Sequence, residues 1–344
     1  MKTILITGGA GFIGSNFAHR LRQHHPDWRI LVLDLLTYAG STENFPVQTP
    51  WQGDEHFQFW FGDVCNGELV DMLVSQSDLV VHFAAESHVT RSIYDNYTFF
   101  RTDVLGTHAV ANAVLKYRDR IERFIHISTS EVYGTAESPA MSEEHSLKPL
   151  SPYASAKCGA DRLVWSYFST YSIPSVIIRP FNNYGPRQHL EKVVPRFITS
   201  VLLGEPLTVH GGGEAARDFV FVEDNCSAIE IALTCDLSKV KGRIFNVGSG
   251  QHRSILEIAR DVLRVMGGSE SQIKFVGERP GQVFRHTADC TALRETLGWA
   301  PSVGWLDGLA LTADWYRSNR AWWEKQVWMR QIPIILANGK RELH

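Results

Sequence analysis

The residues best suited to acid–base chemistry are a tyrosine and a lysine four positions apart, Tyr153 and Lys157. They lie in a stretch entered through Ser151 and Pro152 whose periodicity predicts a helix, so the two side chains share one face. A phenol with a pKa of about 10 is a poor base at neutral pH, and a neighbouring ammonium group favours its ionised form. The pair is a candidate proton acceptor, although Tyr-x-x-x-Lys alone also occurs by chance on ordinary helix surfaces.

A second set of reactive side chains follows a strand-like run at 124–128. Thr129, Ser130 and Glu131 come directly after it, which places hydroxyl groups and one carboxylate at the carboxyl edge of the predicted sheet. Open α/β folds bind their ligands at that edge. We therefore interpret these three residues, together with Tyr153 and Lys157, as one catalytic group.

A glycine-rich segment near the start of the chain is typical of a dinucleotide site. Gly8, Gly11 and Gly14 are evenly spaced, with Phe12 and Ile13 among them, and they follow a strand predicted at 4–7. In such a loop the first glycine permits a tight turn, the second lets the backbone approach a pyrophosphate, and the third allows close helix packing. The strand, turn and helix in sequence make this signal far more specific than the glycines alone.

The choice of cofactor depends on Asp34, which ends the strand predicted at 30–34, about 20 residues beyond the last glycine. A carboxylate there accepts a hydrogen bond from a ribose hydroxyl and repels a 2′-phosphate, so the sequence favours NAD over NADP. Asp63 and Val64, after a third predicted strand, are candidates for the adenine contact. An ordinary loop aspartate is an equally good interpretation of Asp63.

The elements that would position these groups alternate along the first half of the chain. Strands are predicted at 4–7, 30–34, 79–84, 124–128 and 176–179, and helices at 13–24, 66–75, 102–117 and 151–171. Apolar strands interleaved with helices are typical of a parallel sheet covered on both faces. The predicted fold class is α/β, a Rossmann-type doubly wound parallel sheet with a smaller mixed α/β substrate lobe.

The second half is less regular, with helices predicted at 192–203, 222–234 and 254–265. We expect a Rossmann domain over 1–180 with a return segment near 212–250, a discontinuous substrate lobe over 181–330 and a tail over 331–344. Five tryptophans between positions 305 and 328 indicate a helix that packs back onto the body. A platform that stacks on a ligand is the alternative.

Composition excludes several classes of function. The 344 residues include 34 basic and 37 acidic side chains, and a net charge of −3 gives no electrostatic footprint for nucleic acid or an anionic membrane. No apolar run reaches the ~20 residues that span a bilayer, and the chain enters a strand at once, so we expect no leader and a cytoplasmic location. The five scattered cysteines argue for reduced thiols and against a disulfide framework or a structural zinc site.

With these motifs together, the chain resembles the extended short-chain dehydrogenase/reductase superfamily. Within it, the resemblance is to the nucleotide-sugar 4,6-dehydratases, most closely those of the dTDP-glucose type, and it covers nearly the whole chain. Beyond the motifs above it includes blocks specific to nucleotide-sugar enzymes, at residues 36–40, 82–89, 91–93, 131–134, 182–186 and 217–219, followed by an acidic pair at 223–224.

The resemblance implies internal redox catalysis with tightly held NAD. Tyr153, aided by Thr129 and Lys157, would take the proton of the sugar's 4-hydroxyl while the C4 hydride passes to NAD. Glu131 would remove the acidified C5 proton as water leaves C6. The hydride would then return to C6 and the proton to C5, which leaves the cofactor unchanged and gives a 4-keto-6-deoxy sugar.

Ser130 departs from this pattern, as do Thr90, Gln282 and Val283. The dTDP-glucose enzymes typically carry an aspartic acid at the first of these positions to protonate the departing C6 hydroxyl, and a serine hydroxyl cannot replace that acid near neutral pH. Thr-Ser-Glu is similar to dehydratases of other nucleotide sugars and to UDP-glucuronate decarboxylases, in which carbon dioxide leaves instead. A 4,6-dehydratase is therefore the first hypothesis, a UDP-glucuronate decarboxylase the second, and a nucleotide-sugar 4-epimerase the third.

The resemblance also implies a set of substrate contacts. Asn182 would hold the sugar or its diphosphate, and Arg217 and Arg279 would clamp the diphosphate with their planar guanidinium groups. The other candidates in the substrate pocket are Ser87, His88, Arg91, Arg187 and Lys192, and Ala84 is a candidate cofactor contact. For each arginine alone an ordinary salt bridge is the alternative interpretation, and for His88 a structural role.

The predicted helices at 102–117 and 151–171 match those through which relatives form a homodimer by a four-helix bundle. We therefore expect a homodimer, with ordinary core packing as the alternative use of these faces.

Overall fold

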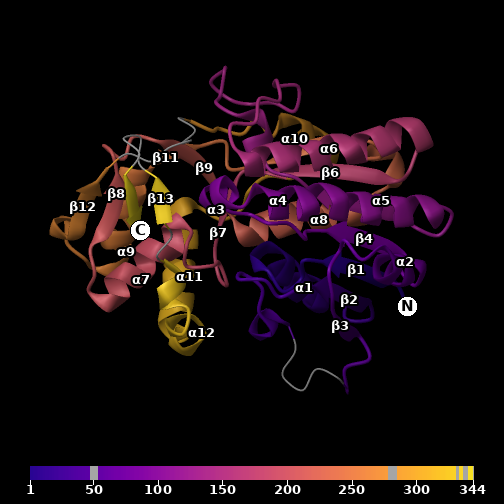
Figure 1. Ribbon diagram of the computed structural model, residues 1–344, viewed down its shortest axis with the longest axis horizontal. Helices are drawn as coiled ribbons and strands as arrows, with labels where there is room; N and C mark the ends of the chain where they lie inside the picture. Colours follow the sequence, from indigo (N-terminus) through magenta and orange to yellow (C-terminus); the bar gives the residue numbers. More distant parts are fainter. Residues whose placement is uncertain (47–52, 278–284, 331–332, 336–339, 344) are drawn as a thin grey trace.

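A seven-stranded parallel sheet forms the larger of two lobes in the computed structural model, which describes residues 1–46, 53–277, 285–330, 333–335 and 340–343 (Figure 1). Its order is β10-β6-β5-β4-β1-β2-β3, and the order reverses between β1 and β4. The strands are β1 (Thr3–Thr7), β2 (Arg29–Asp34), β3 (Phe57–Phe61), β4 (Leu79–His82), β5 (Arg123–Ile127), β6 (Ser175–Pro180) and β10 (Ile244–Val247). This topology confirms the predicted Rossmann-type α/β class.

Helices cover both faces of this sheet, which is why its strands consist mostly of apolar residues. Ile4 and Ile6 of β1 are buried on one face and Leu5 on the other, as alternation along a strand requires. One face packs on α1 (Phe12–His24) and α8 (Val222–Thr234), and the other on α2 (Gly67–Ser75), α5 (Thr107–Lys116) and α6 (Pro152–Tyr171). Burial on both sides fixes the strand ends that carry the candidate site.

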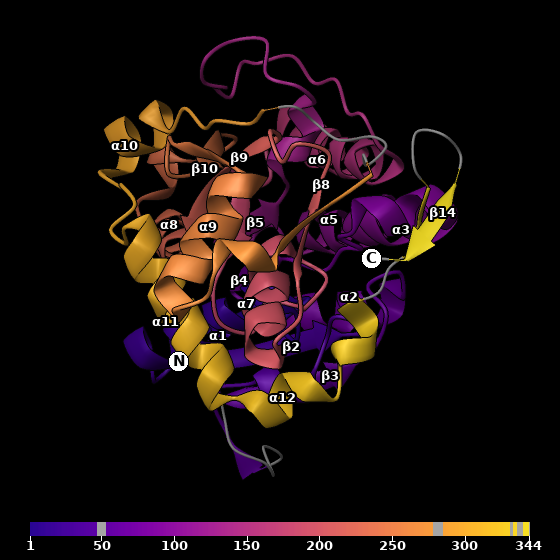
Figure 2. The same ribbon diagram turned by 90° about the vertical axis from the view of Figure 1, so that its left-hand side faces the viewer.

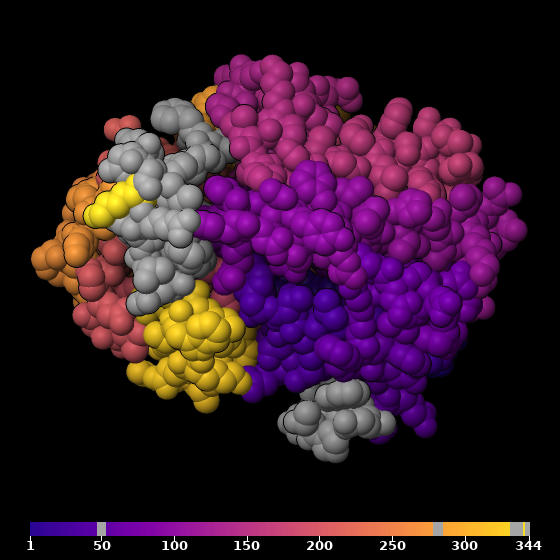
Figure 3. Space-filling model, in the orientation of Figure 1, coloured from indigo at the N-terminus to yellow at the C-terminus, as the bar shows by residue number. Residues whose placement is uncertain are grey.

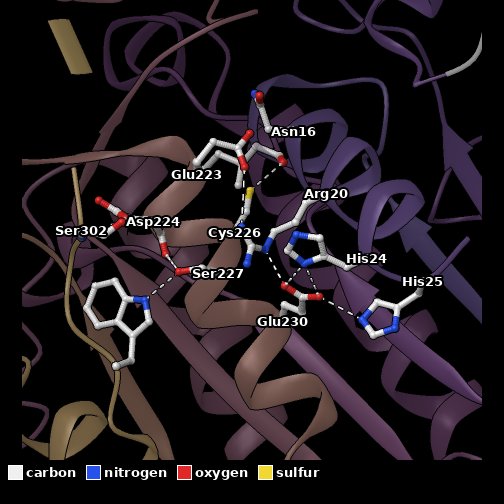
Figure 4. Close-up of polar contacts among 12 residues, drawn as sticks. Asn16, Arg20, His24, His25, Glu223, Asp224, Cys226, Ser227, Glu230 and Ser302 are labelled. Carbon is white, nitrogen blue, oxygen red and sulfur yellow. Dashed lines mark hydrogen bonds and ion pairs between the residues drawn. The ribbon is translucent and has the colours of Figure 1, made fainter. Parts of the chain in front are cut away.

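A charged cluster joins α1 to α8 (Figure 4). The Glu230 carboxylate of α8 accepts a 2.5 Å hydrogen bond from Arg20 and lies 2.9 Å from a ring nitrogen of both His24 and His25. These contacts hold the segment that returns from the smaller lobe against the first β–α unit.

The smaller lobe combines two short sheets with three helices, which face the viewer in Figure 2. One sheet has the order β11-β9-β7 and the other pairs β12 with β8. The elements are β7 (Asn182–Tyr184), α7 (Val193–Leu203), β8 (Leu207–His210), β9 (Ala216–Phe221), β11 (His252–Ser254), α9 (Ile255–Met266), β12 (Ile273–Val276) and α11 (Trp305–Ser318). Because β10 and α10 (Thr291–Leu297) lie with the larger lobe, the chain crosses between the lobes more than once.

Most of the carboxyl-terminal tryptophans pack back onto the body, as the sequence indicates, whereas Trp328 is 71% exposed. In α12 (Arg320–Glu324) the Trp323 side chain is fully buried, and the indole N–H of Trp322 donates to the Asn44 side chain at 2.8 Å. Figure 3 shows these yellow helices against the indigo amino-terminal segment. Strands β13 (Pro333–Ile335) and β14 (Arg341–Leu343) then form an antiparallel pair.

Two predicted elements differ in detail. The strand expected at 79–84 ends at His82, and the residues after it line a cleft. The helix expected at 102–117 is divided: after α3 (Val89–Tyr94) and α4 (Asn96–Phe99), a π-helical segment runs over Phe100–Gly106 and leads into α5. Within the part of the chain that the structure describes, no helix is long and apolar enough to cross a bilayer.

Candidate active site

A cavity of about 450 Å³ lies at the carboxyl end of the large sheet and extends to the smaller lobe. Most residues singled out from the sequence line it, although they come from distant parts of the chain. They are Gly8, Gly11, Phe12, Ile13, Gly14, Asp34, Asp63, Val64, Ala84, Ser87, His88, Thr129, Ser130, Glu131, Tyr153, Lys157, Asn182, Lys192 and Arg217. We call this cavity the cleft.

The glycine loop brings the start of α1 to the floor of the cleft. Gly8 has a positive φ of 72°, and a side chain there would lie 2.5 Å from the Ala84 backbone nitrogen. A side chain at Gly14 would lie 2.3 Å from the Gly8 carbonyl oxygen. Gly11, the N-cap residue, has no side chain to satisfy the first N–H groups of α1, so these groups and the helix dipole suit a pyrophosphate.

Asp34 is positioned to hold a ribose. Its two carboxylate oxygens accept hydrogen bonds from the backbone N–H groups of Ala10, at 3.0 Å, and Leu36, at 2.8 Å. Burial raises the pKa of this carboxyl, while both N–H groups favour its charged form. Each oxygen has a further lone pair, so the residues present fit the adenosine ribose of NAD.

Asp63 lies in the cleft wall, but other protein groups already hold its carboxylate. It accepts from the Cys65 backbone N–H at 2.8 Å and pairs with the Arg101 guanidinium at 2.7 Å. A contact to adenine would therefore share this carboxylate with Arg101.

Tyr153 and Lys157 lie on α6 beside Thr129, which follows β5. The Ser151 hydroxyl caps this helix, and its first turn contains Pro152. Burial raises the pKa of the Tyr153 phenol, the negative charges of Asp103 and Glu131 raise it further, and a hydrogen bond with Thr129 lowers it. The Lys157 ammonium donates to the Ile127 carbonyl oxygen at 2.7 Å.

Asp103, in the π-helical segment, is a buried acid that the sequence analysis missed. Its Oδ1 accepts from the Glu86 backbone N–H at 2.8 Å, whereas the described residues give Oδ2 no hydrogen-bond partner. Burial raises the pKa of Asp103 to about 7 against the attraction of the Lys157 charge. π-Helical segments often occur at functional sites, but the sequence pattern does not reveal one here.

Glu191 is a second buried acid that the sequence analysis missed, and it lines the cleft. Its carboxylate accepts from Tyr38 Oη at 3.0 Å and from Arg91 Nε at 3.1 Å, while the Arg91 guanidinium stacks 4.0 Å from the centre of the Tyr38 ring. Burial opposes ionisation, but Lys192 and the other nearby cationic groups lower the pKa of Glu191 to about 2. Arg91 is thus directed to Glu191 and is not among the described residues that line the cleft.

Of the other predicted substrate residues, some line the cleft and some do not. The Lys192 ammonium donates to the Ser87 carbonyl oxygen at 2.7 Å, and the half-buried Arg217 lies in the cleft, where the charge of Glu131 acts on it. Arg187 instead donates to the Asn16 side chain of α1 at 2.6 Å and is not among the described lining residues. Arg279 lies outside the described residues.

Residues 5–312 match the family of GDP-mannose 4,6 dehydratases. The chain is also 41% identical over 325 residues to the dTDP-glucose 4,6-dehydratase of Streptomyces niveus, an alignment that covers 93% of this chain and 94% of the relative. The chain belongs to this dehydratase family.

Other members share both sequence and structure with this dehydratase-family chain. The low-salt glycan biosynthesis protein Agl12 of Haloferax volcanii is 43% identical over 314 residues, covering 91% of this chain and 98% of the relative. The crystal structure of DesIV, the dTDP-glucose 4,6-dehydratase from Streptomyces venezuelae with NAD and TYD bound, has a TM-score of 0.88 at 38% identity. That match covers 94% of this chain and 99% of DesIV.

Proposed function

We propose that this protein converts dTDP-glucose into the corresponding 4-keto-6-deoxy nucleotide sugar. Its class is that of an NAD-dependent nucleotide-sugar 4,6-dehydratase, a hydro-lyase. The choice of dTDP-glucose rests on 38–41% identity to several dTDP-glucose 4,6-dehydratases over most of the chain. The observation that carries the proposal is that Thr129, Glu131 and Tyr153 line the same cleft as the glycine loop.

The glycine loop and Asp34 would hold NAD. NAD bound there would supply an acceptor for the C4 hydride and a donor for the hydride that C6 receives. Tyr153 takes the proton of the 4-hydroxyl, and Thr129 stabilises the phenolate by a hydrogen bond. Lys157, held by the Ile127 carbonyl, adds positive charge behind that phenolate.

Glu131 is placed to act at the next carbon. It lies in the short helical turn Ser130–Tyr133 that follows β5, and the Thr129 hydroxyl caps that turn by accepting from the Glu131 backbone N–H. Its side chain is 19% exposed, toward the cleft. The carboxylate removes the C5 proton once the 4-ketone has acidified it, and after water has left C6 it gives C5 a proton that has exchanged with solvent.

Residues of the smaller lobe would bind the nucleotide diphosphate. Arg217 of β9 is a partner for the diphosphate, and burial lowers its pKa, so an anionic ligand would restore a favourable environment for its charge. Lys192 and Asn182 extend the same wall. Arg91, Arg187 and Arg279 stay proposed substrate residues, of which the first two would need to turn from their present partners.

A panel of dTDP-, UDP-, GDP- and CDP-sugars, read by product mass, tests this function. Loss of one water from dTDP-glucose supports the proposal, and loss of water from another sugar nucleotide alone would replace the substrate. Loss of carbon dioxide from a UDP-glucuronate would identify a decarboxylase instead. An unchanged mass with altered stereochemistry would identify an epimerase.

We further propose a homodimer formed through α5, α6 and the π-helical segment. Large apolar side chains are exposed along these elements, including Leu105 at 58% and Trp165 at 43%. Light scattering at micromolar concentration should give a dimer mass, and Leu105→Asp should reduce it to that of a monomer. Phe275→Asp, on β12 of the other lobe, is the matched control that should stay dimeric. A monomeric wild-type protein would contradict the proposal.

We also propose a cytoplasmic location. All five cysteines are unpaired, as is typical of a reducing compartment. Fractionation of cells that produce the protein should recover it with cytoplasmic markers, and recovery with an oxidising compartment would contradict this.

A further inference from the structure

Behind the cleft, Ser130 contacts a histidine that lies 156 positions further along the chain. The Ser130 hydroxyl oxygen is 3.3 Å from Nδ1 of His286, and His286 Nε2 is 2.6 Å from the Gly134 carbonyl oxygen. The imidazole is fully buried, whereas Ser130 lines the cleft. Nδ1 also lies 4.0 Å from the Glu131 carboxylate.

This geometry fixes the tautomer of His286. A carbonyl oxygen only accepts, so Nε2 must carry a proton and donate it to Gly134. Nδ1 is therefore the nitrogen that gains or loses a proton, and it is the one that faces Ser130 and Glu131. When Nδ1 is protonated it donates to the Ser130 oxygen, which leaves the Ser130 O–H directed away from the ring.

The dehydration proposed above needs a proton at the departing C6 oxygen, and a serine alone cannot supply it. We propose that Ser130 and His286 form a proton-donating pair, in which Ser130 passes its proton to the leaving hydroxyl and receives the proton of His286 Nδ1. Ser130 would touch the substrate and so is a catalytic residue. His286 acts through it and is a positioning and proton-storing residue. This inference rests on the proposed dehydratase function.

The charges around His286 allow substrate binding to favour the protonated form of its imidazole. Burial lowers its pKa, the Glu131 carboxylate and the Gly134 carbonyl raise it, and Arg217 and His145 lower it. A diphosphate on Arg217 would offset the guanidinium charge, and this effect favours protonated His286 in the substrate complex.

The protons balance over a turnover. The C6–O bond breaks, its electron pair leaves with oxygen, and the proton from Ser130 completes the water molecule. Glu131 takes the C5 proton, which exchanges with solvent while the carboxyl group carries it, and Glu131 then gives one proton to C5. Tyr153 releases to solvent the proton that it took from the 4-hydroxyl, and His286 takes up one proton from solvent. Each turnover therefore removes one proton from the 4-hydroxyl and uses one proton to form water.

Replacement of the leaving group tests this role, because fluoride departs without a proton. His286→Gln should slow water loss from the 6-hydroxy substrate by about 100-fold, as removal of a general acid does. It should leave fluoride loss from the 6-deoxy-6-fluoro analogue near the wild-type rate. In the wild-type protein, kcat should fall at high pH as His286 Nδ1 loses its proton. In His286→Gln this fall should be absent. Equal slowing of both substrates would overturn the proposal, because it would indicate a merely structural role.

Two further variants keep the test decisive if His286→Gln folds poorly. Ser130→Ala should show the same selective loss with the hydroxyl substrate. Ser130→Asp, which supplies a carboxylic acid directly, should restore water loss in the His286→Gln background. His252→Gln is the matched control: His252 is an exposed histidine that contacts Thr287, and the variant should behave as wild type. Wild-type activity of His286→Gln and Ser130→Ala on the hydroxyl substrate would overturn this inference alone, whereas a wild-type protein that dehydrates no nucleotide sugar would overturn the proposed function.

Discussion

The Lys157 ammonium is fixed 2.7 Å from the carbonyl oxygen of Ile127, the last residue of β5. This bond ties α6, which carries Tyr153, to the strand that leads into Thr129 and Glu131. The bond therefore helps to set the position of Tyr153, the proposed base for the 4-hydroxyl, relative to Glu131, the proposed base for C5. Lys157 also attracts the carboxylates of Asp103 and Asp161, so one cation faces two acidic side chains.

Lys157→Met should reduce kcat/KM by about 100-fold or more. Without the ammonium, no positive charge lies behind the phenolate of Tyr153, and the phenolate becomes harder to form. The limb of the pH–rate profile that reports phenol ionisation should move to higher pH. Lys116→Met, which breaks a surface pair with Asp71, is the control. A wild-type profile for Lys157→Met would show that the ammonium has no role.

Glu131→Gln should separate the two halves of the reaction. The variant keeps the backbone cap at Thr129, so NAD binding and oxidation at C4 should persist. Exchange of the C5 hydrogen with solvent deuterium should fall by about 100-fold or more because the amide cannot accept the proton. Mass spectrometry of the recovered sugar measures the exchange, and an unchanged rate would reject Glu131 as the base.

Asp103→Asn should change how stability depends on pH. Burial raises the pKa of Asp103 from 3.8 to about 7, so between these values the folded protein holds a proton that the unfolded chain has lost. Unfolding then releases a proton, and this group makes the free energy of unfolding fall by about 1.4 kcal/mol per pH unit as the pH rises. Above the folded pKa, Asp103 no longer contributes to the free energy of unfolding, and below pH 3.8 its contribution is fully present.

In Asp103→Asn, the free energy of unfolding should lack this fall with rising pH. The asparagine still offers an acceptor to the Glu86 backbone N–H. Denaturant unfolding of both proteins from pH 4 to pH 8 compares the two curves. Parallel curves would show that Asp103 has an ordinary pKa. In the same variant, the limb for Tyr153 ionisation should move to lower pH, because a negative neighbour has been removed.

Asp34→Ala should weaken NAD binding by about 10- to 100-fold, the value of one charge-assisted hydrogen bond of ~1.5–3 kcal/mol. Repulsion of a 2′-phosphate disappears with the carboxylate, so the preference for NAD over NADP should narrow. Titration with each dinucleotide measures both effects, and Asp71→Ala is a surface control. An unchanged preference for NAD over NADP would show that Asp34 does not bind the adenosine ribose.

The sequence predicts well what depends on local pattern. Alternating strands and helices, the glycine loop and the side chains just after β5 all follow from spacing along the chain, and they meet at one sheet edge because the strands are parallel. The same reasoning places Asp34 at the end of β2.

Contacts between distant segments escape such reasoning. His286 reaches Ser130 only through the path of the chain between the lobes, and nothing near either residue marks the pair. Arg187 follows a family block, yet its backbone adopts a φ of +66° and its guanidinium turns to Asn16 of α1. Asp103 lies inside a predicted helix, where a π-helical turn, invisible in the periodicity, directs it to Lys157.

An isotope label tests whether one sugar is both oxidised and reduced within the site. dTDP-glucose with deuterium at C4 should give a 4-keto-6-deoxy product with that deuterium at C6. In deuterated water, unlabelled substrate should gain one deuterium at C5. Retention of the label at C4, or its loss to solvent, would show that no hydride passes from C4 to C6.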